Sequence, residues 1–137
     1  MRITVLFILT SLTIMASACK TAPEETIYPS YDDYPVYEGS DLGVRYTPET
    51  TTFRLWSPTA EEAKLRFYNQ ALGGEASRET NMEKAEQGTW AAQFEEDLNG
   101  VYYTFQVKAN GQWLDETPGP YATAAGTNGK RGLRLRP

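Results

Sequence analysis

Alternation of apolar and polar side chains over four short segments is the feature that most constrains this chain. In TTFRLWS (51–57), Phe53 and Leu55 fall on one face, and Arg54 and Trp56 fall on the other. The same period of two recurs in AKLRFY (63–68), GTWAAQFEE (88–96) and VYYTFQVK (101–108). A period of two is typical of strands that bury one face. We therefore expect each segment to be a half-buried strand.

Residue pairs that favour turns lie around and between these segments. They are Ser57-Pro58, Gly73-Gly74, Gln87-Gly88, Asn99-Gly100 and Asn110-Gly111. Short strands at this spacing predict an all-β sandwich, and no long helical pattern interrupts them. A chain of 137 residues with 40% hydrophobic content is long enough for one core and too short for two ordinary domains.

The Asn110-Gly111 pair predicts a two-residue hairpin with a type I′ turn. The register then pairs Ala109 with Gln112, Lys108 with Trp113, Val107 with Leu114, and Gln106 with Asp115. Leu114 is expected in the core beside Val107, whereas Trp113 is expected on the outer face beside Lys108. A tryptophan in that position has two interpretations: a flanking segment covers it, or its indole is a platform for a sugar ring.

The N-terminal sequence predicts an exported, lipid-anchored protein. MRITVLFILTSLTIMASAC begins with Arg2 and an apolar run, and it ends with small residues before the only cysteine, Cys19. This resembles a lipoprotein signal peptide. We expect residues 1–18 to be the signal peptide and Cys19 to carry the lipid. Residues 19–42, rich in Pro, Tyr and acidic side chains, are expected to be a tether. The expected location is the bacterial cell envelope, at the outer membrane, with membrane contact only through the anchor.

Charge and composition argue against several classes of function. The chain has 13 basic and 18 acidic residues and no histidine, so we expect no nucleic-acid partner and no metal or other cofactor. Carboxylates occur at Glu61-Glu62, at Glu95-Glu96-Asp97 and at Asp115-Glu116. None has an adjacent basic partner in the sequence, so we interpret all of them as solvated surface charge.

Two stretches resemble a known family. YPVYEGSDLGVRYTPETTTFRLWSPTAEEAKLRFYNQALGGEA, followed by GTWAAQFEEDLNGVYYTFQVKANGQWLDETPGPYATAAGTNGKRG, is similar to the N-terminal module of Bacteroides-group type I pullulanases of glycoside hydrolase family 13. The resemblance implies a family-48 carbohydrate-binding module, an early-set immunoglobulin-like β-sandwich, over residues 43–116. Residues 117–137 are expected to be a linker toward a catalytic (β/α)8 barrel that this chain lacks.

The resemblance also implies the site. In glycogen-binding members a Trp after the hairpin turn stacks on glucose, and Trp113 matches it. Thr104 stands where those members have a helpful Lys, Lys108 lies opposite Trp113, and Tyr68 is the aromatic residue nearest to the place of a second stacking Trp. We expect at most weak α-glucan binding, and no catalysis by this chain, because the acid/base pair belongs to the barrel.

Three hypotheses for the function remain open. In the preferred one, the chain is a truncated, non-catalytic module of a starch- and pullulan-debranching α-1,6-glucosidase that supports the barrel. In the second, it is a stand-alone surface lipoprotein that binds starch oligosaccharides. In the third, it is a purely structural sandwich domain.

Overall fold

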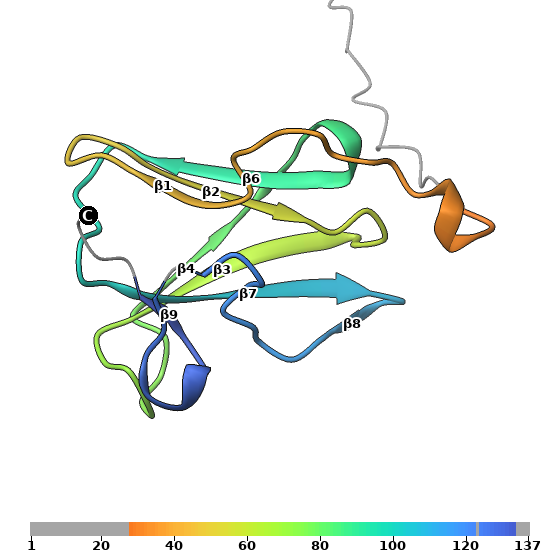
Figure 1. The fold of residues 1–137 in the computed structure, drawn as a ribbon. Coiled ribbons are helices and arrows are strands. Elements are labelled where there is room, and N and C mark those ends of the chain that lie inside the picture. Colours follow the sequence, from red (N-terminus) through yellow and green to blue (C-terminus); the bar gives the residue numbers. More distant parts are fainter. Residues whose placement is uncertain (1–27, 123, 134–137) are drawn as a thin grey trace, which may run out of the picture.

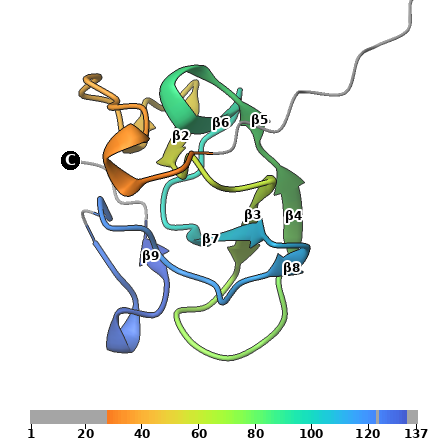
Figure 2. The ribbon, with the colours of Figure 1, turned by 90° about the vertical axis from the view of Figure 1, so that its right-hand side faces the viewer.

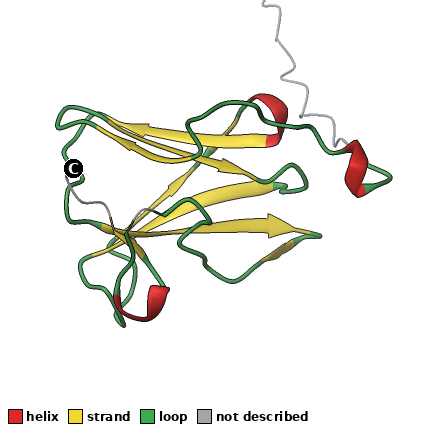
Figure 3. Ribbon diagram, viewed as in Figure 1, coloured by secondary structure: helices red, strands yellow, loops and turns green. Residues whose placement is uncertain are grey.

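Two antiparallel sheets face each other in the computed structural model, which describes residues 28–122 and 124–133 (Figure 1). The first sheet holds, in spatial order, β1 (Gly43–Tyr46), β2 (Thr51–Trp56), β6 (Thr89–Phe94) and β5 (Glu83–Lys84). The second holds β4 (Arg78–Asn81), β3 (Glu62–Tyr68), β7 (Tyr102–Ala109) and β8 (Gln112–Trp113), and β9 (Gly132–Leu133) also pairs with β7. The described helices are three single 3-10 turns, η1 (Tyr31–Asp33), η2 (Glu86–Gly88) and η3 (Thr127–Gly129) (Figure 3).

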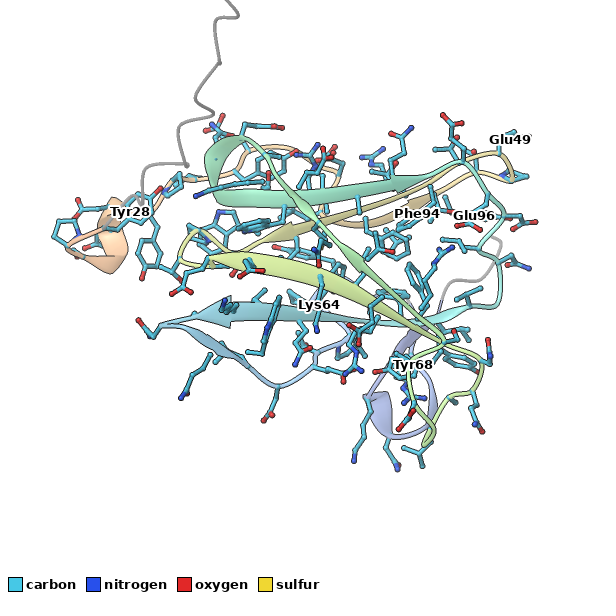
Figure 4. The ribbon with its side chains drawn as sticks, turned by 180° about the vertical axis from the view of Figure 1, so that it is seen from behind. Tyr28, Glu49, Lys64, Tyr68, Phe94 and Glu96 are labelled. Carbon is cyan, nitrogen blue, oxygen red and sulfur yellow. The ribbon has the colours of Figure 1, made fainter. Side chains whose placement is uncertain are left out.

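The core lies between the sheets and consists of the apolar faces that the alternation predicts. Phe53 is its centre, because its ring packs edge-to-face against four neighbours with centroids 5.1–6.3 Å away: Phe67, Phe94, Tyr103 and Phe105. Such pairs add stabilisation beyond the buried area of the rings. Figure 4 shows Phe94 between the two sheets. The predicted immunoglobulin-like β-sandwich is confirmed.

The β7–β8 hairpin has the predicted turn and register. Asn110 and Gly111 have φ angles of 51° and 72°, as a type I′ turn requires, and Lys108 pairs with Trp113. Beyond Leu114 the register shifts by one residue, because Phe105 pairs with Thr117 and not with Glu116. An extra residue in one strand is a bulge.

The prediction that Leu114 lies in the core is wrong, since its side chain is 49% exposed. The fully buried part of β7 ends at Phe105, and Val107 is already only half-buried. Leu114 follows β8 at the edge of the sheet, beyond the part of β7 that the described residues of the first sheet bury.

The segment that follows the hairpin, described over residues 117–122 and 124–133, returns to the sandwich. Thr117 bridges Phe105, and Gly132 pairs with Tyr103, so this ribbon and β8 together occupy one edge of β7 (Figure 2). Gly119 has φ of +85°, and a Cβ there would lie 2.9 Å from the Phe105 ring. The first residues of the predicted linker, Thr117 to Gly119, therefore pack against Phe105 of the core.

Residues 28–42, assigned above to the tether, contact the outer face of the first sheet. Trp56 donates its indole N–H to the carbonyl of Pro35 at 3.1 Å, and Arg54 Nε lies 2.9 Å from Asp41 Oδ2. The signal peptide and Cys19 lie outside the described residues. Among the described residues, no helix has the length and apolar character needed to span a bilayer.

Candidate outer-face site

The outer face of the second sheet carries the residues that the sequence analysis singled out. Side chains alternate on each strand, so Lys64, Arg66 and Tyr68 of β3 share this face with Thr104 and Lys108 of β7. Trp113 lies at the hairpin end, opposite Lys108. Figure 4 shows Lys64 along β3 and Tyr68 near the C-terminal ribbon. These side chains therefore form a row along the two strands, with Trp113 at the hairpin end and Tyr68 at the other end.

Trp113 is 38% exposed and points outward, as predicted. The cation over its ring is Lys64, whose Nζ lies 4.4 Å from the ring centroid and 3.2 Å from Glu79 Oε2. Lys108 is the cross-strand partner of Trp113, as predicted, and its Nζ forms an ion pair with Glu62 at 2.7 Å. The hydrogen bond to Glu62 raises the pKa of Lys108. The indole is thus a fixed, partly open aromatic surface with two lysines nearby.

A polar cluster occupies the end of this row that holds Tyr68. Glu116 accepts hydrogen bonds from the guanidinium of Arg66, the hydroxyl of Tyr68 and the hydroxyl of Thr104, the last at 2.6 Å. Thr104 and Tyr68 are only 2% and 3% exposed. Burial by itself would raise the pKa of Glu116, but the Thr104 and Tyr68 hydrogen bonds and the charge of Arg66 outweigh it and lower the pKa. Glu116 is therefore an ionised carboxylate that holds the strands together.

Three of the predicted surface carboxylates have a basic partner in the fold. Glu62 and Glu96 are still exposed, as predicted, whereas the interpretation as solvated charge is wrong for Glu116, which is half-buried. Glu62 pairs with Lys108, Glu96 pairs with Arg78, and Glu116 pairs with Arg66. These partners are 18 to 50 residues apart in the sequence. The pairing of β3 with β7 brings Glu62 to Lys108, the bulge before Thr117 brings Glu116 to Arg66, and the packing of the two sheets brings Glu96, which follows β6, to Arg78 of β4. The sequence pattern specifies none of these arrangements.

The four predicted carbohydrate-binding residues do not form one open site. Trp113 and Lys108 lie together at the hairpin, whereas Thr104 and Tyr68 are buried under Glu116 and the ribbon. Thr104 and Lys108 are four residues apart on one strand, which corresponds to about 13 Å. Of the four residues, Trp113 presents a partly exposed ring, whereas Thr104 and Tyr68 are 2% and 3% exposed.

An open groove of about 870 Å³ adjoins the polar cluster. Its walls are the loop after β3 and the C-terminal ribbon, and Arg66, Tyr68, Thr104 and Glu116 belong to its lining. Arg131 joins the two walls: its Nη1 donates to the carbonyls of Gln70 and Gly73 at 2.7 and 2.8 Å. Its guanidinium carbon also lies 3.4 Å from the centre of the Tyr68 ring. Sequence reasoning missed Arg131, which the folded ribbon brings to this place.

Comparison with known families agrees with this architecture. Residues 41–122 match carbohydrate-binding module 48, described as the isoamylase N-terminal domain. The chain belongs to the carbohydrate-binding module 48 family. The match spans the strands from β1 to β8, and the ribbon as far as Ala122.

The relatives of this module are pullulanases. The chain is 35% identical over 108 residues to the pullulanase of Bacillus subtilis (strain 168), covering 79% of this chain and 14% of that protein. It is 44% identical, with a TM-score of 0.73, to the pullulanase of Paenibacillus barengoltzii in complex with maltohexaose and alpha-cyclodextrin, covering 77% and 16%. It is 36% identical, with a TM-score of 0.70, to the pullulanase of Bacillus acidopullulyticus, and this match covers 75% of this chain and 12% of that chain. The chain thus spans about a sixth or less of the length of these proteins.

Proposed function

We propose that the chain is the non-catalytic N-terminal module of a Bacteroides-group debranching α-1,6-glucosidase, where it supports the catalytic barrel and binds α-glucan weakly through Trp113. The observation that carries the binding proposal is the partly exposed indole on the outer face of a sheet, held there by the type I′ hairpin. Single exposed apolar side chains are common, but tryptophan is a large one and is enriched at binding interfaces. The C–H face of a pyranose is a suitable cover for an indole, and Lys108 is the cross-strand neighbour of Trp113.

The expected affinity is low. By analogy with stacking of a base on an aromatic side chain, one platform contributes about 1–3 kcal/mol. A dissociation constant of about 1 mM needs about 4 kcal/mol. Because Thr104 and Tyr68 are buried, no second predicted side chain adds an open platform on this face. Binding weaker than about 1 mM is therefore expected.

The test is a titration of the full chain with maltoheptaose, followed by NMR amide shifts. We expect shifts around Trp113 and Lys108 that grow with sugar concentration, loss of these shifts in Trp113→Ala, and no loss in Leu114→Ala. Leu114 is the matched control because it is the next residue, is 49% exposed and faces the other way. Two results would contradict the proposal. The first is that amides next to residue 113 shift as much in Trp113→Ala as in the wild type, and the second is that no amide of the wild type shifts at about 10 mM sugar.

We propose further that the chain does not hydrolyse pullulan. A glycosidase needs a general acid whose pKa is raised, whereas Glu116, the most buried of the paired carboxylates, has a lowered pKa and three hydrogen-bond donors. Purified chain should release no reducing sugar. Activity that follows the protein peak through repurification would be the contrary result.

We also propose that Cys19 is lipidated after removal of residues 1–18, which would anchor the module to the outer membrane of a Gram-negative envelope. Support comes from the small residues before Cys19 and the apolar run before them. Metabolic labelling with a palmitate analogue should mark the wild-type chain and leave Cys19→Ala unmarked. Equal labelling of both chains would exclude this anchor.

A further inference from the structure

An aromatic pocket lies on the outer face of the first sheet, the layer opposite to the one that carries Trp113. It has a volume of about 390 Å³, and three separate parts of the chain line it. The N-terminal segment contributes Tyr34, Val36 and Tyr37, β2 contributes Trp56, and the C-terminal ribbon contributes Tyr121. This volume lies at the lower end of the range for small-molecule sites, about 300–1,000 Å³.

Hydrogen bonds and close packing hold the pocket walls in place. Trp56 is tied to the Pro35 carbonyl, and Tyr37 donates its hydroxyl to Asp41. Asp41 is in turn fixed by Arg54 Nε at 2.9 Å. Tyr121 packs so closely on the start of β1 that a Cβ at residue 43, a glycine, would lie 2.8 Å from Tyr121 Cβ. The aromatic side chains are therefore held in place by neighbours in the sequence and across the sheet.

The same walls leave apolar surface uncovered. Val36 is 72% exposed and Tyr121 is 52% exposed, the two highest values among the exposed large hydrophobic residues of the described chain. Both line this pocket. Exposed apolar surface that gathers at one concave place indicates a binding site.

The chemistry of the pocket points to a neutral, hydroxylated ring. Aromatic side chains accept the apolar face of a pyranose, and the exposed Asp32 at the pocket accepts hydrogen bonds from hydroxyls. Asp32 and its neighbours Asp33 and Glu38 make the surroundings acidic, which disfavours phosphate or anionic sugars. The small volume suits the end of a glucan chain better than a long stretch of it.

We infer that this pocket, formed by Tyr34, Val36, Tyr37, Trp56 and Tyr121, is a second α-glucan site that receives a terminal hexose unit. The choice of α-glucan as the ligand rests on the proposed function, whereas the existence of the site rests on the pocket itself. The outer faces of the two layers of a sandwich point in opposite directions, so this site and Trp113 act independently. The inference also gives a role to the tyrosine-rich segment before β1, which would otherwise only be a tether.

The experiment is the maltoheptaose titration of the full chain, observed at the Trp56 indole N–H and at the backbone amides of residues 34–37 and 121. We expect shifts at these positions that persist in Trp113→Ala. They should be lost in Tyr121→Ala and retained in Tyr121→Phe, which keeps the ring. Tyr121 is a suitable position because it is exposed, and the dispersion of amide signals reports whether the variant is folded.

Each outcome separates the two sites. Shifts confined to the Trp113 region overturn this inference and leave the proposed function intact. Shifts confined to the aromatic pocket support this inference and remove the role of Trp113. An absence of shifts at both sites at about 10 mM sugar overturns both, and then Val36 and Tyr121 are assigned to contact with another protein domain.

Discussion

Replacing Glu116 by alanine tests whether the polar cluster stabilises the sandwich. The substitution removes the acceptor shared by Arg66, Tyr68 and Thr104. Arg66 keeps a partner, since its Nε lies 2.7 Å from Glu79 Oε1. The hydroxyls of Thr104 and Tyr68 lose their acceptor, and these two residues are only 2% and 3% exposed.

The expected magnitude follows from the two hydroxyls. A buried polar group left without a partner costs about 1–3 kcal/mol. Both residues also line the open groove, so water can reach the vacated space and the cost stays below the maximum. We expect Glu116→Ala to lower the free energy of unfolding by about 2–4 kcal/mol.

The assay is urea denaturation of the full chain at neutral pH, followed by tryptophan fluorescence. Glu75→Ala is the matched control, because Glu75 lines the same groove and is exposed. A surface substitution of that kind changes stability by no more than about 0.5 kcal/mol. If Glu116→Ala and Glu75→Ala have the same effect within that margin, the reasoning about the cluster is refuted.

The same carboxylate makes stability depend on pH with a definite sign. The pKa of Glu116 is lowered in the folded state, so its stabilisation is fully present above the unfolded value of about 4.3 and is lost as pH falls through the folded pKa. The stability difference between wild type and Glu116→Gln should therefore shrink below about pH 4. A difference that stays constant from neutral pH to about pH 3 would contradict the assignment.

Two further predictions concern the C-terminal ribbon. Gly119→Ala should lower the free energy of unfolding by about 2–4 kcal/mol in the same urea assay. The reason is that a side chain at φ of +85° is strained and its Cβ would meet the Phe105 ring. A neutral effect would show that the ribbon does not cover the core. Arg131→Ala should speed amide hydrogen exchange in residues 70–74, and Arg131→Lys should restore little of the protection, because lysine lacks the planar fork that donates to both carbonyls. Unchanged exchange in Arg131→Ala would mean that this clamp is unimportant in solution.

The sequence by itself determined the sandwich and its core, and the reason is local. Burial of one strand face imposes a period of two, so Phe53, Leu65 and Phe105 could be assigned to the core without knowledge of the pairing. Asn110-Gly111 likewise fixed its own turn and the register of its hairpin as far as Leu114, because the backbone conformation of two residues decides both. The outward position of Trp113 followed from that register.

Only the tertiary structure decided what lies over each outer face. Glu116 meets Arg66 and Tyr68 because β3 pairs with β7 and a bulge shifts the following residues, and no local pattern encodes either event. Leu114 keeps its predicted register and is still exposed, because burial depends on the layer above a residue as well as on the direction of its side chain. The aromatic pocket depends most on the fold, since it joins Tyr37, Trp56 and Tyr121 from three distant parts of the chain.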